Sequence, residues 1–241
     1  SSNSCKTSNY DVYRANQKNF VQLPGSPFLY QVPISYLKLF ATHPRFCKQE
    51  NVFVREGIHS KPDERFQRYY WEILDFNRRW KPLAVGGARQ KWAGLDDALV
   101  DFENHGIRIK QMPAPIVPSE DLYSRTGISY SDAGGCGFSC RILESNCIFS
   151  STGPAIIFEE ENFIFPVMAY LNSTPISFLL DSLNPGNHYK INDILRLPFP
   201  RTILRNVTIS TLAEKAVSTK KKLLKMSLIS VSYTHLTLPT N

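Results

Sequence analysis

The feature that most constrains the fold of this chain is a change of sequence pattern near Phe163. Between residues 128 and 158, short apolar runs alternate with Gly-, Ser- and Asn-containing turns, which is typical of β-strands joined by short loops. After residue 163, apolar residues recur at helical spacing over 165–171, 175–183 and 212–224. The pattern predicts an α+β fold, with a curved mixed β-sheet between about residues 50 and 160 and helices after it.

The part of the chain before residue 128 adds further expected elements. Pro33 precedes apolar positions that predict a short helix up to Thr42, because proline suits the first turn of a helix. Residues 52–54 and 98–102 are apolar and predict strands. Residues 63–73 fit a helix by the spacing of their apolar residues and a strand near their end, so both alternatives stay open.

Charge and hydropathy favour a partner that is anionic and not a membrane. The formal net charge is +7 and the sequence pI is about 9.1, which favours nucleic acid, although a solvated basic surface without a partner would explain the charge equally well. The longest apolar stretch, residues 163–183, is interrupted by Asn172-Ser173-Thr174-Pro175, and the first ten residues are polar. We therefore expect a cytoplasmic protein with no membrane partner.

The cysteines and acidic residues predict no metal site. Five cysteines at irregular spacing argue against a disulfide framework, and no paired Cys-x-x-Cys is present for zinc, so buried free thiols are expected. The run Glu159-Glu160-Glu161 does not converge on one ion, because adjacent carboxylates point in different directions; it predicts a solvated turn.

The loop from Gly86 to Trp92 is the densest combination of glycine, basic and aromatic residues in the chain. Glycine lets a backbone approach a ligand closely, Arg89 and Lys91 suit phosphates, and Gln90 suits the edge of an adenine. The same residues would also suit a tight turn with a buried Trp92. Sequence chemistry does not decide between the two interpretations.

A succession of motifs along the chain resembles one family of enzymes. In order, these motifs are Arg65-Phe66-Gln67-Arg68-Tyr69-Tyr70-Trp71-Glu72-Ile73, the segment 81–92, Val100-Asp101-Phe102-Glu103-Asn104-His105-Gly106, Arg125-Thr126-Gly127-Ile128-Ser129-Tyr130, Phe138-Ser139-Cys140-Arg141 and 191–198. The succession resembles the region behind the catalytic domain in large adenine-specific DNA methyltransferases, the PglX type of phage-exclusion (BREX) systems and related restriction-modification enzymes. The last motif is also similar to the end of a recognition domain in type I restriction specificity subunits. Where the family usually has Thr-Gly-Asp-Asn, this chain has Ser60-Lys61-Pro62-Asp63.

The resemblance implies that the parent protein transfers a methyl group from S-adenosylmethionine to the exocyclic amine of adenine in a specific DNA sequence. This chain would recognise double-stranded DNA beside a catalytic methyltransferase domain of the same parent chain. It contains neither the Gly-rich loop that holds the cofactor nor the Asn-Pro-Pro loop that holds the flipped base, so no catalytic, cofactor-binding or metal residue is expected here. The expected DNA-binding residues are Gly86, Gly87, Arg89, Lys91, Arg125 and Arg141, with their basic side chains on one exposed face.

The chain divides into four expected parts. Residues 1–22 form a ragged N-terminal edge, 23–200 the target-recognition region, 201–227 a helical segment, and 228–241 a tail. Residues 231–240 resemble a translated sequencing adapter, so the tail is expected to pack against nothing and both natural termini to be missing.

Two further functions remain open at this point. The chain would also suit a stand-alone DNA specificity subunit that works with a separate methyltransferase. A protein-interaction domain with no role in DNA binding is the second alternative, and it would bind DNA with little dependence on salt.

Overall fold

The computed structural model describes residues 32–46, 51–60, 63–74, 79–95, 97–113, 117–133, 137–184 and 188–226. In these residues the fold is α+β, as the sequence pattern predicts. The expected tail from residue 228 and the expected N-terminal edge lie outside the described residues.

The strands form two sheets of four, where a single curved sheet was expected. The central sheet has the order β1-β8-β5-β6 and is antiparallel throughout, with bounds β1 (Val52–Arg55), β5 (Gly127–Tyr130), β6 (Cys140–Leu143) and β8 (Ala155–Phe158). The outer sheet has the order β2-β4-β3-β7, with bounds β2 (Gln67–Tyr69), β3 (Trp80–Ala84), β4 (Ala98–Asp101) and β7 (Ile148–Phe149). Only its β3–β7 pair is parallel. The chain crosses between the two sheets after β1, β4, β6 and β7.

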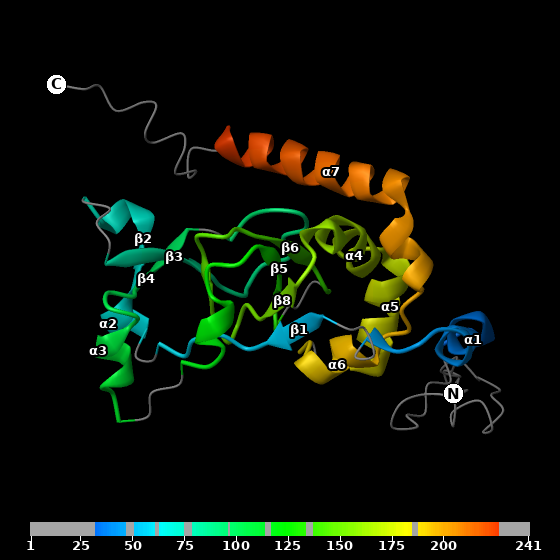
Figure 1. Ribbon diagram of the computed structural model, residues 1–241, viewed down its shortest axis with the longest axis horizontal. Helices are drawn as coiled ribbons and strands as arrows, with labels where there is room; N and C mark the ends of the chain where they lie inside the picture. The colour runs from blue at the N-terminus through cyan, green and yellow to red at the C-terminus, as the bar shows by residue number, and fades with distance from the viewer. Residues whose placement is uncertain are drawn as a thin grey trace, which may run out of the picture.

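Strand β8 shows why a second sheet is needed. All four of its residues are buried, and they alternate between two cores: Ile156 and Phe158 belong to the core shared with the helices, Ala155 and Ile157 to the core shared with the outer sheet. A strand that is apolar on both faces needs a covering layer on each side. Helices cover one face of the central sheet, and the outer sheet covers the other (Figure 1).

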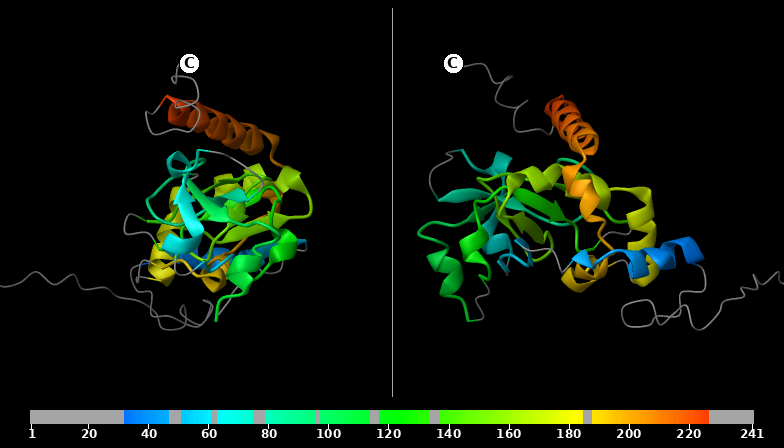
Figure 2. Two further views of the ribbon diagram at one scale, coloured as in Figure 1. Left: turned by 90° about the vertical axis from the view of Figure 1, so that its left-hand side faces the viewer. Right: turned by 45° about the vertical axis from the view of Figure 1, so that its right-hand side comes forward.

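A short helix ends at Thr42 and longer helices follow residue 163, as expected, although no helix was specified for residues 191–196. They are α1 (Ile34–Thr42), α4 (Ile164–Leu171), α5 (Thr174–Leu183), α6 (Ile191–Arg196) and α7 (Val207–Lys225). Pro33 is the N-cap of α1 and Ser173 that of α5. Helix α7 begins five residues before the expected start at Leu212, because the Asn206 side chain accepts a hydrogen bond from the Ile209 amide and caps the earlier turn. Helix α7 lies beside α4 along one side of the molecule (Figures 1 and 2).

The segment 63–73 contains both of the structures that its pattern allowed. A single turn, α2 (Asp63–Phe66), leads directly into β2, which is followed by the 3-10 turn η3 (Tyr70–Glu72). Pairing with β4 decides the conformation of the middle part, since Gln67 to Tyr69 lie opposite Val100 to Ala98. The remaining short elements are α3 (Ile107–Lys110), η4 (Glu120–Leu122), η5 (Glu161–Phe163) and η6 (Arg201–Arg205).

Cys140 and Cys147 are buried free thiols, as expected; the other three cysteines lie outside the described residues. Burial raises the pKa of the Cys140 thiol, so it stays protonated. Among the described residues, no single helix has the length and hydropathy to cross a membrane, and one bent pair, Glu161–Leu171 with Thr174–Leu183, meets those two criteria together.

Candidate nucleic-acid interface

The loop that follows β3 is fixed to the central sheet at its first glycine. The Gly86 amide donates a hydrogen bond to Thr152 Oγ1 at 3.1 Å, and a Cβ atom on Gly86 would lie 1.9 Å from the Thr152 carbonyl oxygen. Gly86 is therefore required by the close approach of two backbone segments. Gly87 differs: its φ is +141°, and a Cβ atom there would meet nothing within 4 Å, so its backbone faces open space.

The far end of the same loop covers the free edge of β6. The Trp92 amide donates to the Cys140 carbonyl, and the Ile142 amide donates to the Trp92 carbonyl, both at 3.0 Å. Trp92 is half-buried against the helical core. An uncovered edge strand would expose a row of unpaired amides and carbonyls, which this loop satisfies. The loop thus holds the two sheets together, and the tight-turn interpretation accounts for much of it.

Lys91 is held by the end of helix α4. Its Nζ donates to the Asn172 carbonyl at 2.6 Å, and Asn172 in turn binds both backbone groups of Cys140 through its side chain. Partial burial lowers the pKa of Lys91, and the positive charge of Arg89 lowers it further. A cation at the C-terminal end of a helix stabilises its unpaired carbonyls, so Lys91 has a structural role here, and its role at a phosphate stays a prediction.

The expectation that Arg141 lies on an exposed face is wrong. Only 1% of its surface is accessible, and its guanidinium donates to Ser131 Oγ at 3.3 Å and to the Val85 carbonyl. The reason is the second sheet: β6 lies between two packed layers, so its Arg141 side chain runs inward and binds the loop backbone. Arg125 is half-buried and donates to the Phe158 carbonyl at 3.0 Å. It precedes β5, whereas Arg141 lies opposite Ser129 further along that strand.

The predicted site residues therefore separate into two groups. Gly86, Lys91 and Arg141 meet around one loop and are engaged in internal contacts, and Arg125 is bound elsewhere on the central sheet. Gly87 and Arg89 are exposed on that loop. A direct role of any of the six residues in DNA binding stays a prediction.

An open pocket of about 700 Å³ beside this loop was not predicted from the sequence. Its lining residues come from α2, β2, η3, β4 and the segments after β3 and before β8; they are Asp63, Glu64, Gln67, Arg68, Tyr69, Glu72, Val85, Ala98 and Thr152. In the sequence, residues 63–73 combine helix-like and strand-like spacing and are rich in polar and aromatic side chains. That irregular pattern was the only indication of the pocket. Val85 and Thr152 connect this pocket to Gly86.

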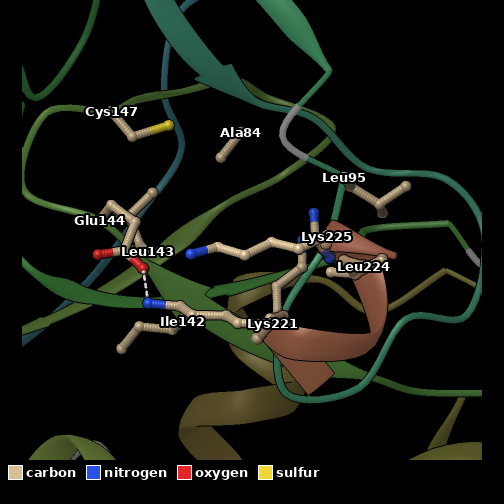
Figure 3. A pocket seen from close by; sticks show the side chains of 12 residues that line it. Ala84, Leu95, Ile142, Leu143, Glu144, Cys147, Lys221, Leu224 and Lys225 are labelled. Atoms are coloured by element: carbon tan, nitrogen blue, oxygen red, sulfur yellow. Dashed lines mark ion pairs between the residues drawn. The ribbon is translucent and has the colours of Figure 1, made fainter. Parts of the chain in front are cut away.

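A second, smaller pocket of about 170 Å³ lies under the C-terminal end of α7 (Figure 3). Lys221 reaches across it and forms an ion pair with Glu144, while Ala84 and Cys147 line another part of its wall. Lys222 and Lys225 on the same helix end are exposed. These lysines place positive charge beside the pocket, next to Leu95 in the segment that continues from the loop.

Comparison with known proteins gives two relatives, and no family model matches the chain. The chain is 26% identical over 213 residues, 85% of its length, to the adenine-specific methyltransferase BrxX of Escherichia coli O9:H4 (strain HS). It is 26% identical over 231 residues, 88% of its length, to the adenine-specific methyltransferase PglX of Lacticaseibacillus casei (strain Zhang). The matched regions are 17% and 19% of these proteins, so the chain spans less than a fifth of the relatives it matches. The similarity supports a relationship to BrxX- and PglX-type adenine methyltransferases.

Proposed function

We propose that this chain is the DNA-recognition region of a site-specific adenine DNA methyltransferase that acts in phage defence or restriction-modification. The observation that carries the proposal is the similarity to two adenine-specific methyltransferases over more than four fifths of the chain. The parent would transfer a methyl group from S-adenosylmethionine to the exocyclic amine of an adenine that has left the helical stack. Double-stranded DNA and the catalytic domain of the same parent chain are the proposed partners.

The cofactor would be bound by another part of the parent, because the described residues do not fit it. The Gly86-Gly87 turn is closed on one side by the Thr152 carbonyl and leads to the edge of β6, whereas a cofactor loop opens a helix whose N-terminus faces the ligand. This chain would instead supply contacts to the duplex. Exposed Arg89 suits a phosphate, and the open backbone at Gly87 allows close approach.

Salt-dependent binding of duplex DNA tests the proposal. We expect the purified chain to bind a fluorescein-labelled duplex of mixed sequence, measured by fluorescence anisotropy, with log K falling linearly with log salt concentration. Each phosphate contact contributes about −0.9 to that slope. Absence of binding at low salt, or binding with a slope near zero, would contradict a role in DNA recognition and favour a protein-interaction domain.

Replacing Arg89 with alanine is expected to weaken duplex binding and to bring the slope closer to zero by about 0.9, the contribution of one phosphate. Stability should stay within about 0.5 kcal/mol of the unsubstituted chain, because Arg89 is exposed. The matched control is Arg196→Ala, an exposed arginine at the end of α6 and outside the Gly86 to Trp92 loop. If the two substitutions change the slope of log K against log salt concentration equally, Arg89 is not part of the DNA-binding interface.

A further inference from the structure

Two exposed aromatic rings stand together at the edge of the outer sheet. The rings of Tyr69 and Trp71 are parallel within 4°, and their centroids are 4.5 Å apart. Even so, 52% of the surface of Tyr69 and 51% of that of Trp71 are accessible to solvent. Large aromatic side chains exposed side by side on a surface mark an interaction site. Their function is not explained by the fold, since neither residue belongs to the two buried cores.

The backbone under the two rings is held rigidly. Tyr70, between them, is buried, and its ring packs edge-on against Trp71 at 5.0 Å. The Tyr69 amide donates to Glu72 Oε2 at 2.6 Å, and the Tyr70 amide donates to the Asp97 carbonyl at 3.1 Å. A fixed aromatic pair loses little conformational entropy when a flat ligand stacks on it.

The pocket beside the rings has the character of a site for a base and not for a phosphate. Tyr69 lines it together with three carboxylates, those of Asp63, Glu64 and Glu72, and with one cation, Arg68. The guanidinium of Arg68 donates to the carbonyls of Glu64 and Gln67. Excess negative charge repels phosphate, whereas carboxylates accept hydrogen bonds from the exocyclic amines of adenine, cytosine and guanine. The charged lining also differs from the core of a protein–protein interface, where charged residues are depleted.

We propose that Tyr69 and Trp71 form a stacking platform for a DNA base that has left the helical stack, with Glu64 and Glu72 favouring a base that carries an amino group. The inference rests on the proposed function, and it assigns to this platform, beside the pocket that Tyr69 lines, an unpaired base other than the adenine that the catalytic domain would methylate. Val85, which also lines this pocket, leads into the loop that carries the exposed Gly87 and Arg89.

Duplexes with one unpaired base provide the test. The full chain is titrated by fluorescence anisotropy with four duplexes that are identical except for a single unpaired adenine, cytosine or thymine, or none. We expect the adenine and cytosine bulges to bind more tightly than the thymine bulge and the fully paired duplex. Trp71→Ala and Tyr69→Ala should each lower affinity for the adenine bulge by about 5- to 150-fold, the range for one stacked base, and leave the salt slope unchanged.

Two further variants separate stacking from folding defects and from hydrogen bonding. Trp71→Phe keeps a flat ring and should retain most of the affinity, while Glu64→Gln should reduce the preference for adenine over thymine. Phe178→Ala on α5, where the ring is 37% exposed and contacts Tyr36, is the control for loss of a surface aromatic and should leave binding unchanged.

The failure of this inference differs from the failure of the proposed function. If no duplex binds at all, the proposed function fails and the platform fails with it. A second outcome is that the paired duplex binds with the expected salt slope, but Trp71→Ala lowers the affinity for all four duplexes equally or for none of them. In that case the platform is overturned and the proposed function stands. If Trp71→Ala weakens only association with the rest of the parent methyltransferase, the rings form a protein contact and the platform is again overturned.

Discussion

Replacing Gly86 with alanine is expected to lower the free energy of unfolding by about 3 kcal/mol, at the upper end of what overpacking costs. The new Cβ atom would lie 1.9 Å from the Thr152 carbonyl oxygen and 2.7 Å from its carbon, and neither is the movable end of a side chain. The two backbone segments must separate, which breaks the hydrogen bond from the Gly86 amide to Thr152 Oγ1. Urea unfolding followed by circular dichroism measures the change.

The matched control is Arg89→Ala, three residues along the same loop, where exposure predicts a change within about 0.5 kcal/mol. The comparison separates a structural glycine from one that faces a ligand. If Gly86→Ala were as stable as the unsubstituted chain and impaired only DNA binding, the close approach to Thr152 would have to be abandoned as the reason for glycine here.

The second large effect is expected at Asn172, which ends helix α4 and is 5% exposed. Its Oδ1 accepts from the Cys140 amide at 3.0 Å, and its Nδ2 donates to the Cys140 carbonyl at 2.9 Å. Asn172→Ala would remove both bonds and leave the buried Cys140 amide without this acceptor. A buried unsatisfied group costs about 1–3 kcal/mol, and the lost side-chain volume adds to it, so we expect a loss of about 3 kcal/mol.

Thermal and urea unfolding of Asn172→Ala are compared with those of Asn162→Ala. Asn162 is exposed, and its amide makes a long 3.4 Å bond to Glu160, so its loss should change stability by less than about 0.5 kcal/mol. Similar stabilities for the two variants would mean that the contact between α4 and β6 does not depend on the Asn172 side chain.

The class of the fold was predictable because it depends on local pattern. Helical spacing after residue 163 and the turn residues around short apolar runs are properties of neighbouring residues, and α4 to α7 and β5 to β8 follow them. The assignment of strands to two sheets depends instead on contacts between distant segments. Residues 148–149 read like any other short apolar run, yet they pair with β3 and not with the strands on either side of them.

The candidate site was predictable only in part, for the same reason. The Gly86 to Trp92 loop was recognised from its residue types, but the burial of Arg141 follows from the carbonyl of Val85, a residue 56 positions away that the sequence does not place beside it. An arginine next to apolar neighbours has no local signal that distinguishes a surface side chain from one that binds an internal carbonyl. The Tyr69 and Trp71 pair was visible as residues, while their parallel stacking depends on the change from β2 to η3 between them.

The repeated crossing of the chain between the two sheets limits how such a region can diversify. Strands β1 and β8 are hydrogen-bonded neighbours, although 99 residues separate the end of one from the start of the other (from Arg55 to Ala155). Genetic exchange with a breakpoint anywhere inside this interval would therefore join a β1 from one ancestor to a β8 from another, across a pairing of four residues in the central sheet. Residues 52–158 therefore have to be exchanged together if the pairing of β1 with β8 is to be kept. New preferences for a DNA sequence should arise by point substitution on the surface loops or by replacement of the whole segment, and not by exchange of single strands.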